Sequence, residues 1–169
     1  HVLIGKERTD VGRPNDQGYP IRGIVTATHL FLKNYEPSRW PAGNPETGYL
    51  DTDASPTKTD ILEQGRKSRD NTYWRLCFGL RPAQELFDLT KDRDCTQNLA
   101  TVPSQSNRVA ELEARMETEL LEQGDPRMKG DGKIFDAYVP TAGAGFYEQY
   151  MRGEKVNAGW VNKTDFESG

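Results

Sequence analysis

The segment YPIRGIVTATHLFLKNYEP, residues 19–37, decides the fold. It contains two runs rich in β-branched, aromatic and other large apolar residues, Ile21–Ala27 and Leu30–Tyr35, with a two-residue break between them. Such runs fit a pleated, half-buried surface, and the short break predicts an antiparallel hairpin. Pro37 ends the second strand, because proline cannot donate a hydrogen bond to a sheet ladder.

Further segments extend this hairpin into a small sheet with helices. The opening HVLIG reads as another strand, and Glu85–Leu89 reads as a short one. Ser55 is a favourable N-cap and proline follows it at the first helical position, so we predict a helix over Pro56–Ser68. Residues 37–56 are too rich in proline and glycine for a helix or a central strand, which predicts a long loop.

The clearest helix prediction covers Asn107–Gln123. Apolar residues recur there every three or four positions, and charged residues fill the other faces. Gly124 and Pro126 follow in the order typical of a helix end. We therefore expect an α+β fold: a small, mainly antiparallel sheet with one long amphipathic helix packed across it, a second shorter helix and long loops. The apolar stripe of the long helix consists of Val109, Leu112, Met116 and Leu120.

Length and charge bound the class of protein. A chain of 169 residues fits one domain, 1–169, with a single core. The 22 basic and 26 acidic residues give a net charge of -4, which argues against a nucleic-acid partner. No apolar run is long enough to span a membrane. Because the chain begins at His1 inside a predicted strand, we expect a piece of a longer protein, with residues 141–169 as a tail that wraps along a surface.

The segment GKERTDVGRPND, residues 5–16, concentrates charged residues near the start of the chain. A lysine and an arginine two positions apart on one face of a strand could clamp an oxyanion such as sulfate, phosphate or carboxylate. Glu7 would then point the other way or bridge to Arg13. The alternative is a solvated charged loop. The candidate substrate-binding residues are Lys6, Glu7, Arg8, Asp10 and Arg13.

The rest of the sequence offers little chemistry. His29 is the internal histidine and falls in a predicted turn, and no G-x-S-x-G nucleophile motif occurs. Residues 51–60 begin like an EF-hand loop but place proline where that loop needs glycine, so we expect no metal site. The acidic and amide residues of 92–98 read as turn formers. Cys77 and Cys95 are a candidate disulfide in an oxidising compartment, or two separate thiols.

Several segments in one order resemble a known family. QELFDLTKDRDCTQNLA, residues 84–100, is similar to the strand–turn segment near the C-terminus of sulfatases, where an acidic residue, Leu, an aromatic residue, Asp and Leu lead through a turn to Asn-Leu-Ala. GKERTDVGRPND, GYPIRGI, EPSRWPAGNPETGY and GDPRMKGDGKIFDAY are similar to the heparan N-sulfatase (sulfamidase)-like subgroup. The resemblance covers residues 2–140. Two positions depart from it: Arg93 stands where proline is usual, and Thr9 where many relatives have histidine.

The resemblance implies the C-terminal subdomain of a sulfatase that hydrolyses sulfate esters or N-sulfates of carbohydrates of the glycosaminoglycan type. Sulfatases use a formylglycine made within a C/S-x-P-S-R motif, together with calcium. Neither Cys77 nor Cys95 lies in such a motif. The resemblance therefore places the formylglycine and the calcium in a preceding catalytic domain, so this chain alone is expected to be inactive.

The expected partners follow from the same resemblance. They are the N-terminal catalytic domain of the same polypeptide and a sulfated carbohydrate, with no nucleic acid and no membrane, in a periplasmic, secreted or lysosomal setting. The opening charged residues would lie at the seam with the catalytic domain, and Trp40 would serve as a sugar platform or pack on that domain. The alternative is a stand-alone carbohydrate-binding or protein-interaction module without catalysis.

Overall fold

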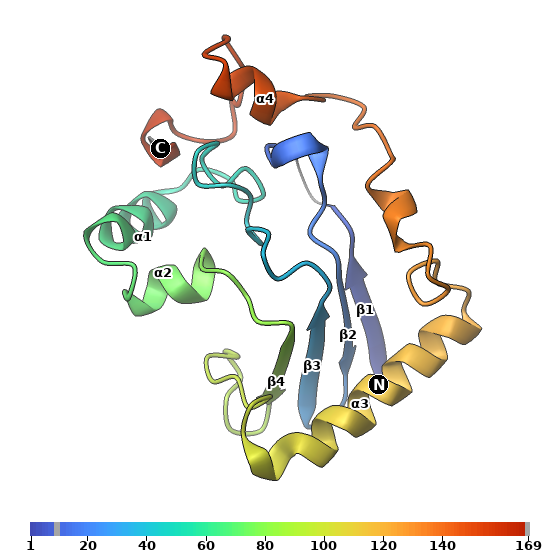
Figure 1. Cartoon of the computed structure of the whole chain (residues 1–169). Coiled ribbons are helices and arrows are strands. Elements are labelled where there is room, and N and C mark those ends of the chain that lie inside the picture. Colours follow the sequence, from blue (N-terminus) through green and yellow to red (C-terminus); the bar gives the residue numbers. More distant parts are fainter. Residues whose placement is uncertain (9–10, 168–169) are drawn as a thin grey trace. The chain divides into compact units, whose positions relative to one another are not determined.

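A computed structural model describes residues 1–8 and 11–167 (Figure 1). The chain forms two compact units, each built from three segments. The first unit contains the sheet and the longest helix, and the second contains the shorter helices. The first unit comprises His1–Glu7, Pro20–Glu36 and Pro82–Ala137, and the second comprises Arg8–Tyr19, Pro37–Arg81 and Tyr138–Gly169.

The first unit is built on a four-stranded antiparallel sheet with the strand order β1-β2-β3-β4 (Figure 1). The predicted hairpin forms, with its turn displaced toward the N-terminus. The side chain of Thr26 explains the shift, because its hydroxyl oxygen accepts a hydrogen bond from the backbone N–H of His29 at 2.9 Å. The strands are β1 (Val2–Lys6), β2 (Ile21–Val25), β3 (His29–Asn34) and β4 (Gln84–Asp88).

Helix α3 (Ser106–Glu122) packs across one face of this sheet (Figure 1). The sheet contributes Ile24, Phe31 and Leu86 to the shared core, and all three are fully buried. The predicted apolar stripe supplies the helix side of the core and is confirmed, as is the α+β fold class. A left-handed glycine follows the helix end, where a side chain would be strained. The buried residues of the stripe are Val109, Leu112, Met116 and Leu120.

The segment after β4 is held by side-chain hydrogen bonds to the backbone. Asp88 accepts from the N–H of Thr90 at 3.0 Å and from its hydroxyl at 2.5 Å. The hydroxyl bond is the main reason that the pKa of Asp88 is lowered to about 2. Asp92 accepts from the N–H of Gln97 at 2.8 Å. The prediction that Asp92 forms a turn is therefore confirmed.

Asn98 ties the end of this turn back to strand β4. Its Oδ1 accepts hydrogen bonds from the N–H groups of Leu86 and Ala100, both at 2.9 Å. Its Nδ2 donates to the carbonyl of Gln84 at 3.1 Å. The N–H of Leu99 then donates to the carbonyl of Leu86 at 2.8 Å. The amide of Asn98 thus replaces a missing strand partner along the open edge of β4.

The second unit buries two clusters of apolar side chains, so the expectation of a single core is wrong. Ser55 caps α1 (Pro56–Lys67) by accepting a hydrogen bond from the N–H of Lys58 at 3.0 Å, as predicted. Gly65 lies against the ring of Trp74, where a Cβ would stand 2.1 Å from Cδ1. The helices of this unit are α1 (Pro56–Lys67), α2 (Thr72–Cys77) and α4 (Phe146–Met151), with short 3-10 helices at Pro14–Asp16 and Lys163–Asp165; the first unit has two more, at Pro103–Gln105 and Gly132–Phe135.

The C-terminal segment packs against the loop that precedes α1. The indole N–H of Trp160 donates to the carbonyl of Leu50 at 3.1 Å. The buried ammonium of Lys58 donates to two loop carbonyls at 2.7 and 2.8 Å, and it lies 3.4 Å from the buried carboxylate of Asp165. The assignment of residues 1–169 to one domain of a longer protein stays a prediction.

Candidate functional site

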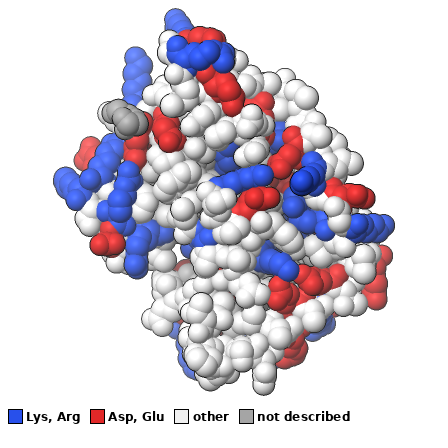
Figure 2. All heavy atoms as spheres, in the orientation of Figure 1, with Lys and Arg blue, Asp and Glu red and all other residues white. Residues whose placement is uncertain are grey.

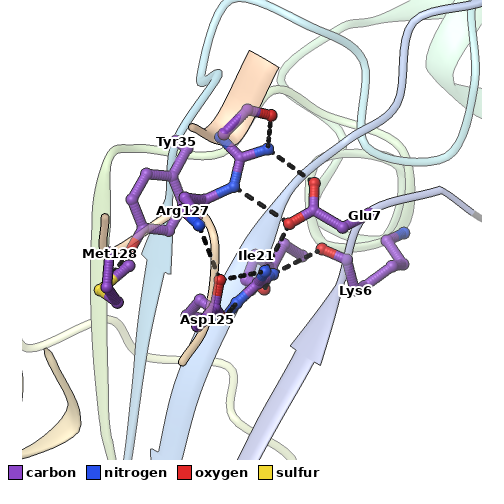
Figure 3. A network of polar contacts seen from close by, with 9 residues as sticks. Lys6, Glu7, Ile21, Tyr35, Asp125, Arg127 and Met128 are labelled. Carbon is purple, nitrogen blue, oxygen red and sulfur yellow. Dashed lines mark hydrogen bonds and ion pairs between the residues drawn. The ribbon is translucent and has the colours of Figure 1, made fainter. Parts of the chain in front are cut away.

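Two arginines and two carboxylates form a continuous chain of ion pairs in the first unit, which we call the clasp: Glu7, Arg22, Asp125 and Arg127 (Figure 3). Arg22 reaches Asp125 through Nε at 2.5 Å and Glu7 through Nη2 at 2.5 Å. Arg127 donates two hydrogen bonds to the carboxylate of Glu7, from Nε at 3.0 Å and from Nη2 at 2.6 Å. The clasp therefore joins the end of β1, the strand β2 and the loop after α3.

The clasp is neutral overall and largely shielded from water. The exposed fraction of its side chains is 7% for Arg22, 11% for Arg127, 12% for Asp125 and 21% for Glu7. Burial alone would lower the pKa of Arg22, but the hydrogen bonds that it donates to Asp125 and Glu7 outweigh burial and raise that pKa. Burial raises the pKa of Asp125, but the bonds from Arg22 and from the N–H of Arg127 lower it overall. Elsewhere, basic and acidic side chains are interspersed on the face shown in Figure 2.

Aromatic rings flank the clasp on two sides. The guanidinium carbon of Arg127 lies 5.1 Å from the ring centre of Tyr35 and 5.6 Å from that of Phe135. The guanidinium carbon of Arg22 lies 5.9 Å from the Phe135 ring. Rings at these distances stabilise a cation through their negative faces.

A cavity of about 330 Å³ lies beside the clasp, near the lower limit for ligand-binding pockets. Its walls are mixed and combine apolar residues of β1 and α3 with three of the clasp residues. All five N–H groups of Arg22 are engaged: two by Asp125, one by Glu7, and two by the carbonyls of Lys6 and Ile21. The clasp therefore stabilises three segments and leaves no Arg22 donor for a ligand. The lining residues are Leu3, Ile4, Gly5, Lys6, Glu7, Arg22, Leu120, Gln123, Asp125 and Phe135.

The structure gives the predicted residues Lys6 and Glu7 roles in this framework. Lys6 is the last residue of β1, and its backbone carbonyl accepts from Arg22 at 3.4 Å. The carboxylate of Glu7 binds Arg22 and Arg127. Of the two alternatives for Glu7, the bridge to Arg13 is not the one observed, because Glu7 pairs with Arg22 and Arg127 and Arg13 pairs with Asp51. Whether Lys6 and Glu7 also contact substrate stays a prediction.

Arg13 is an internal residue of the second unit, with only 1% of its surface exposed. Its Nε donates to the carbonyl of Trp40 at 2.9 Å and its Nη2 to that of Pro41 at 3.0 Å. Nη2 also forms a 2.6 Å ion pair with Asp51, which is itself nearly buried. Arg13 thereby stabilises the proline-rich loop. Its predicted contact with substrate is untested.

Arg8 lies beyond the end of β1, so the expectation that Lys6 and Arg8 share a strand face is wrong. It is half-buried, and its Nη1 donates to the carbonyl of Tyr138 at 2.8 Å. Its Nε and Nη2 are shielded from solvent and have no hydrogen-bond partner among the residues that the structure describes. The candidate Asp10 lies outside the described residues.

The remaining candidates add no catalytic constellation. Cys77 and Cys95 are both free thiols. Within residues 1–8 and 11–167, no group of three or more His, Cys, Asp or Glu side chains is arranged to hold a metal ion. No helix in this part of the chain has the length and apolar character needed to cross a bilayer.

Sequence reasoning missed three of the four clasp residues, Arg22, Asp125 and Arg127. One local signal was present: Arg22 interrupts the apolar strand IRGIV, and a charge at such a position needs a buried partner. One carboxylate partner, Glu7, lies directly after the neighbouring strand β1, but the other, Asp125, lies 103 residues away in the sequence. No local pattern identifies them.

Comparison with known proteins adds no assignment. No protein-family model matches the chain, and no curated protein matches it by sequence.

Proposed function

We propose that this chain is the C-terminal part of a sulfatase that removes sulfate esters or N-sulfates from carbohydrates of the glycosaminoglycan type. The observation that carries the proposal is the behaviour of the sulfatase-like segment, residues 84–100, as one folding element. Asp88 closes the first turn. Asn98 forms two hydrogen bonds with β4, at Gln84 and Leu86, and a third with the N–H of Ala100. The family pattern specifies Asp and Asn at positions 88 and 98, and these two side chains make the hydrogen bonds that hold the segment together.

The fold supports the same proposal. A sequence pattern that ends one strand, turns and leads into a long helix fits an antiparallel sheet covered by α3. The helix α3 covers one face of the sheet, and in the proposal the opposite face meets a neighbouring domain. Apolar side chains at Val2 and Ile4, exposed by 62% and 40%, lie at the edge strand of that sheet. In the proposal they belong to the surface that meets the catalytic domain.

The chain's own residues do not fit the two catalytic groups that sulfatases require. No C/S-x-P-S-R motif occurs in the sequence, so no residue here can become the formylglycine. We therefore assign the formylglycine and the calcium to the catalytic domain and derive no hydrolytic step from this chain. Its proposed contributions are a stable framework and contacts to the substrate.

The experiment compares the purified 169-residue chain with the complete polypeptide encoded by its gene. We expect the region upstream of His1 to encode a C/S-x-P-S-R motif, and the complete protein to hydrolyse 4-methylumbelliferyl sulfate or N-sulfoglucosamine. The isolated chain should release no sulfate. Turnover by the isolated chain, or a complete gene without that motif, would refute the proposal. Binding of sulfated glycans by a protein without the motif would instead identify a stand-alone carbohydrate-binding module.

A further inference from the structure

Three arginines of this chain show which hydrogen-bond acceptors its guanidinium groups use. Arg22 binds both oxygens of Asp125 with its Nε and Nη2, at 2.5 and 3.2 Å. Arg127 binds both oxygens of Glu7 with the same two atoms, at 3.0 and 2.6 Å. Arg13 uses its Nε and Nη2 for two carbonyls and a carboxylate. In each case the Nε–Nη2 edge is filled by oxygen atoms of the same unit.

Arg8 differs from these three arginines in the partners of its Nε–Nη2 edge. Its Nη1 is anchored on the carbonyl of Tyr138 at 2.8 Å, which fixes the guanidinium group from the opposite side. The Nε and Nη2 are both shielded from bulk water and have no acceptor in the described parts of the chain. A shielded cationic donor pair without acceptors is costly, so such groups normally have a partner. A group with two oxygens side by side, such as a carboxylate or a sulfate, would satisfy both donors at once.

We infer that the Nε–Nη2 edge of Arg8 binds the oxyanion of a ligand, namely a sulfate or carboxylate group carried by a sugar. The fork of a guanidinium matches two oxygens of either group, as the Arg22–Asp125 pair in this chain demonstrates. The inference rests on the proposed function for the identity of the sugar. It deepens that proposal by singling out Arg8 among the five candidate residues, because Glu7 and Arg13 already hold internal partners.

The first test measures anion binding by the complete 169-residue chain, without reference to catalysis. The arginine Nε–H signals are followed by ¹H–¹⁵N NMR while sodium sulfate or sodium glucuronate is added at constant ionic strength, balanced with sodium chloride. We expect the Arg8 signal to shift and saturate with one of the two anions, and the stronger one identifies sulfate or carboxylate as the recognised group. An Arg8 signal that responds to neither anion overturns the inference.

The matched variant is Arg8→Lys, which keeps the positive charge but loses the two-pronged edge. It should weaken anion binding about tenfold, because a lysine is a point charge rather than a fork. The control is Arg152→Lys, an exposed arginine whose Nε lies 2.6 Å from Glu154, and it should bind as the wild type does. Equal affinity of Arg8→Lys and wild type would overturn the inference.

Kinetics of the complete protein separate this inference from the proposed function. If the complete protein hydrolyses sulfate esters and Arg8→Lys leaves both KM and kcat unchanged, the inference fails while the proposed function stands. If the isolated chain binds the anion through Arg8 and the complete protein hydrolyses no sulfate ester, the proposed function fails while the inference stands.

Discussion

Replacing Glu7 by glutamine should destabilise the first unit more than any surface charge change. The substitution removes a carboxylate that accepts from Arg127 at 3.0 and 2.6 Å and pairs with Arg22 at 2.5 Å. Both guanidinium groups are about nine-tenths buried, so an unbalanced positive charge remains in a poorly hydrated place. Breaking a buried ion pair costs about 3–5 kcal/mol. Because Glu7 is 21% exposed, we expect a loss of about 2–4 kcal/mol in the free energy of unfolding.

Urea unfolding, followed by circular dichroism at 222 nm, measures this loss, and amide hydrogen exchange of α3 peptides localises it. The control is Glu111→Gln, which removes an exposed partner of Arg108 and should cost less than about 1 kcal/mol. The double variant Glu7→Gln/Arg127→Gln restores neutrality and should cost at least about 0.5 kcal/mol less than the sum of its single changes. A Glu7→Gln protein as stable as the Glu111→Gln control would contradict the assigned role of the clasp.

Three further predictions concern other contacts. Asn98→Ala should lower the free energy of unfolding by about 1–3 kcal/mol, because the N–H groups that Asn98 now accepts from would lose their partner. Asn98→Asp should lower it less, because aspartate keeps the acceptor oxygen. Urea unfolding compares the two variants, and equal losses would contradict this role of Asn98. Gly65→Ala should lower the free energy of unfolding by about 1–3 kcal/mol, because the added methyl group forces the Trp74 ring to move. Unchanged tryptophan fluorescence together with unchanged stability would contradict this packing. Because the pKa of Asp125 is lowered in the folded state, its contribution to the free energy of unfolding should be complete above about pH 4 and should be lost as the pH falls further. In Asp125→Asn, the free energy of unfolding should therefore fall less steeply with decreasing pH.

The hairpin and the long helix could be predicted because their signals are local. The period of the apolar stripe sets the buried face of α3, and the predicted range differs from Ser106–Glu122 by one residue at each end. The predicted end of β2 was two residues too late and the predicted start of β3 one residue too late. The reason is that the hydroxyl of Thr26 accepts a hydrogen bond from the N–H of His29, which no count of apolar residues reveals. Helices α2 and α4, with six residues each, are too short for a periodic pattern.

The sequence alone predicts that charged residues cluster in 5–16, but it does not predict the role of each one. Residue type alone does not separate Arg13, with its buried ion pair, from Arg8, whose Nε and Nη2 have no acceptor among the described residues. The distinction depends on partners far along the chain, such as Asp51 for Arg13 and Arg127 for Glu7. Such long-range pairings follow from the tertiary fold, which single-sequence patterns do not encode.

The neutrality of the clasp also limits how this sequence can change over time. Losing any single member leaves an odd charge in the interior, whereas exchanging Glu7 together with Arg127, or Arg22 together with Asp125, preserves the balance. Descendants of this sequence should therefore keep all four residues or replace them in pairs. Such paired replacement would be visible as correlated columns when homologous sequences are aligned.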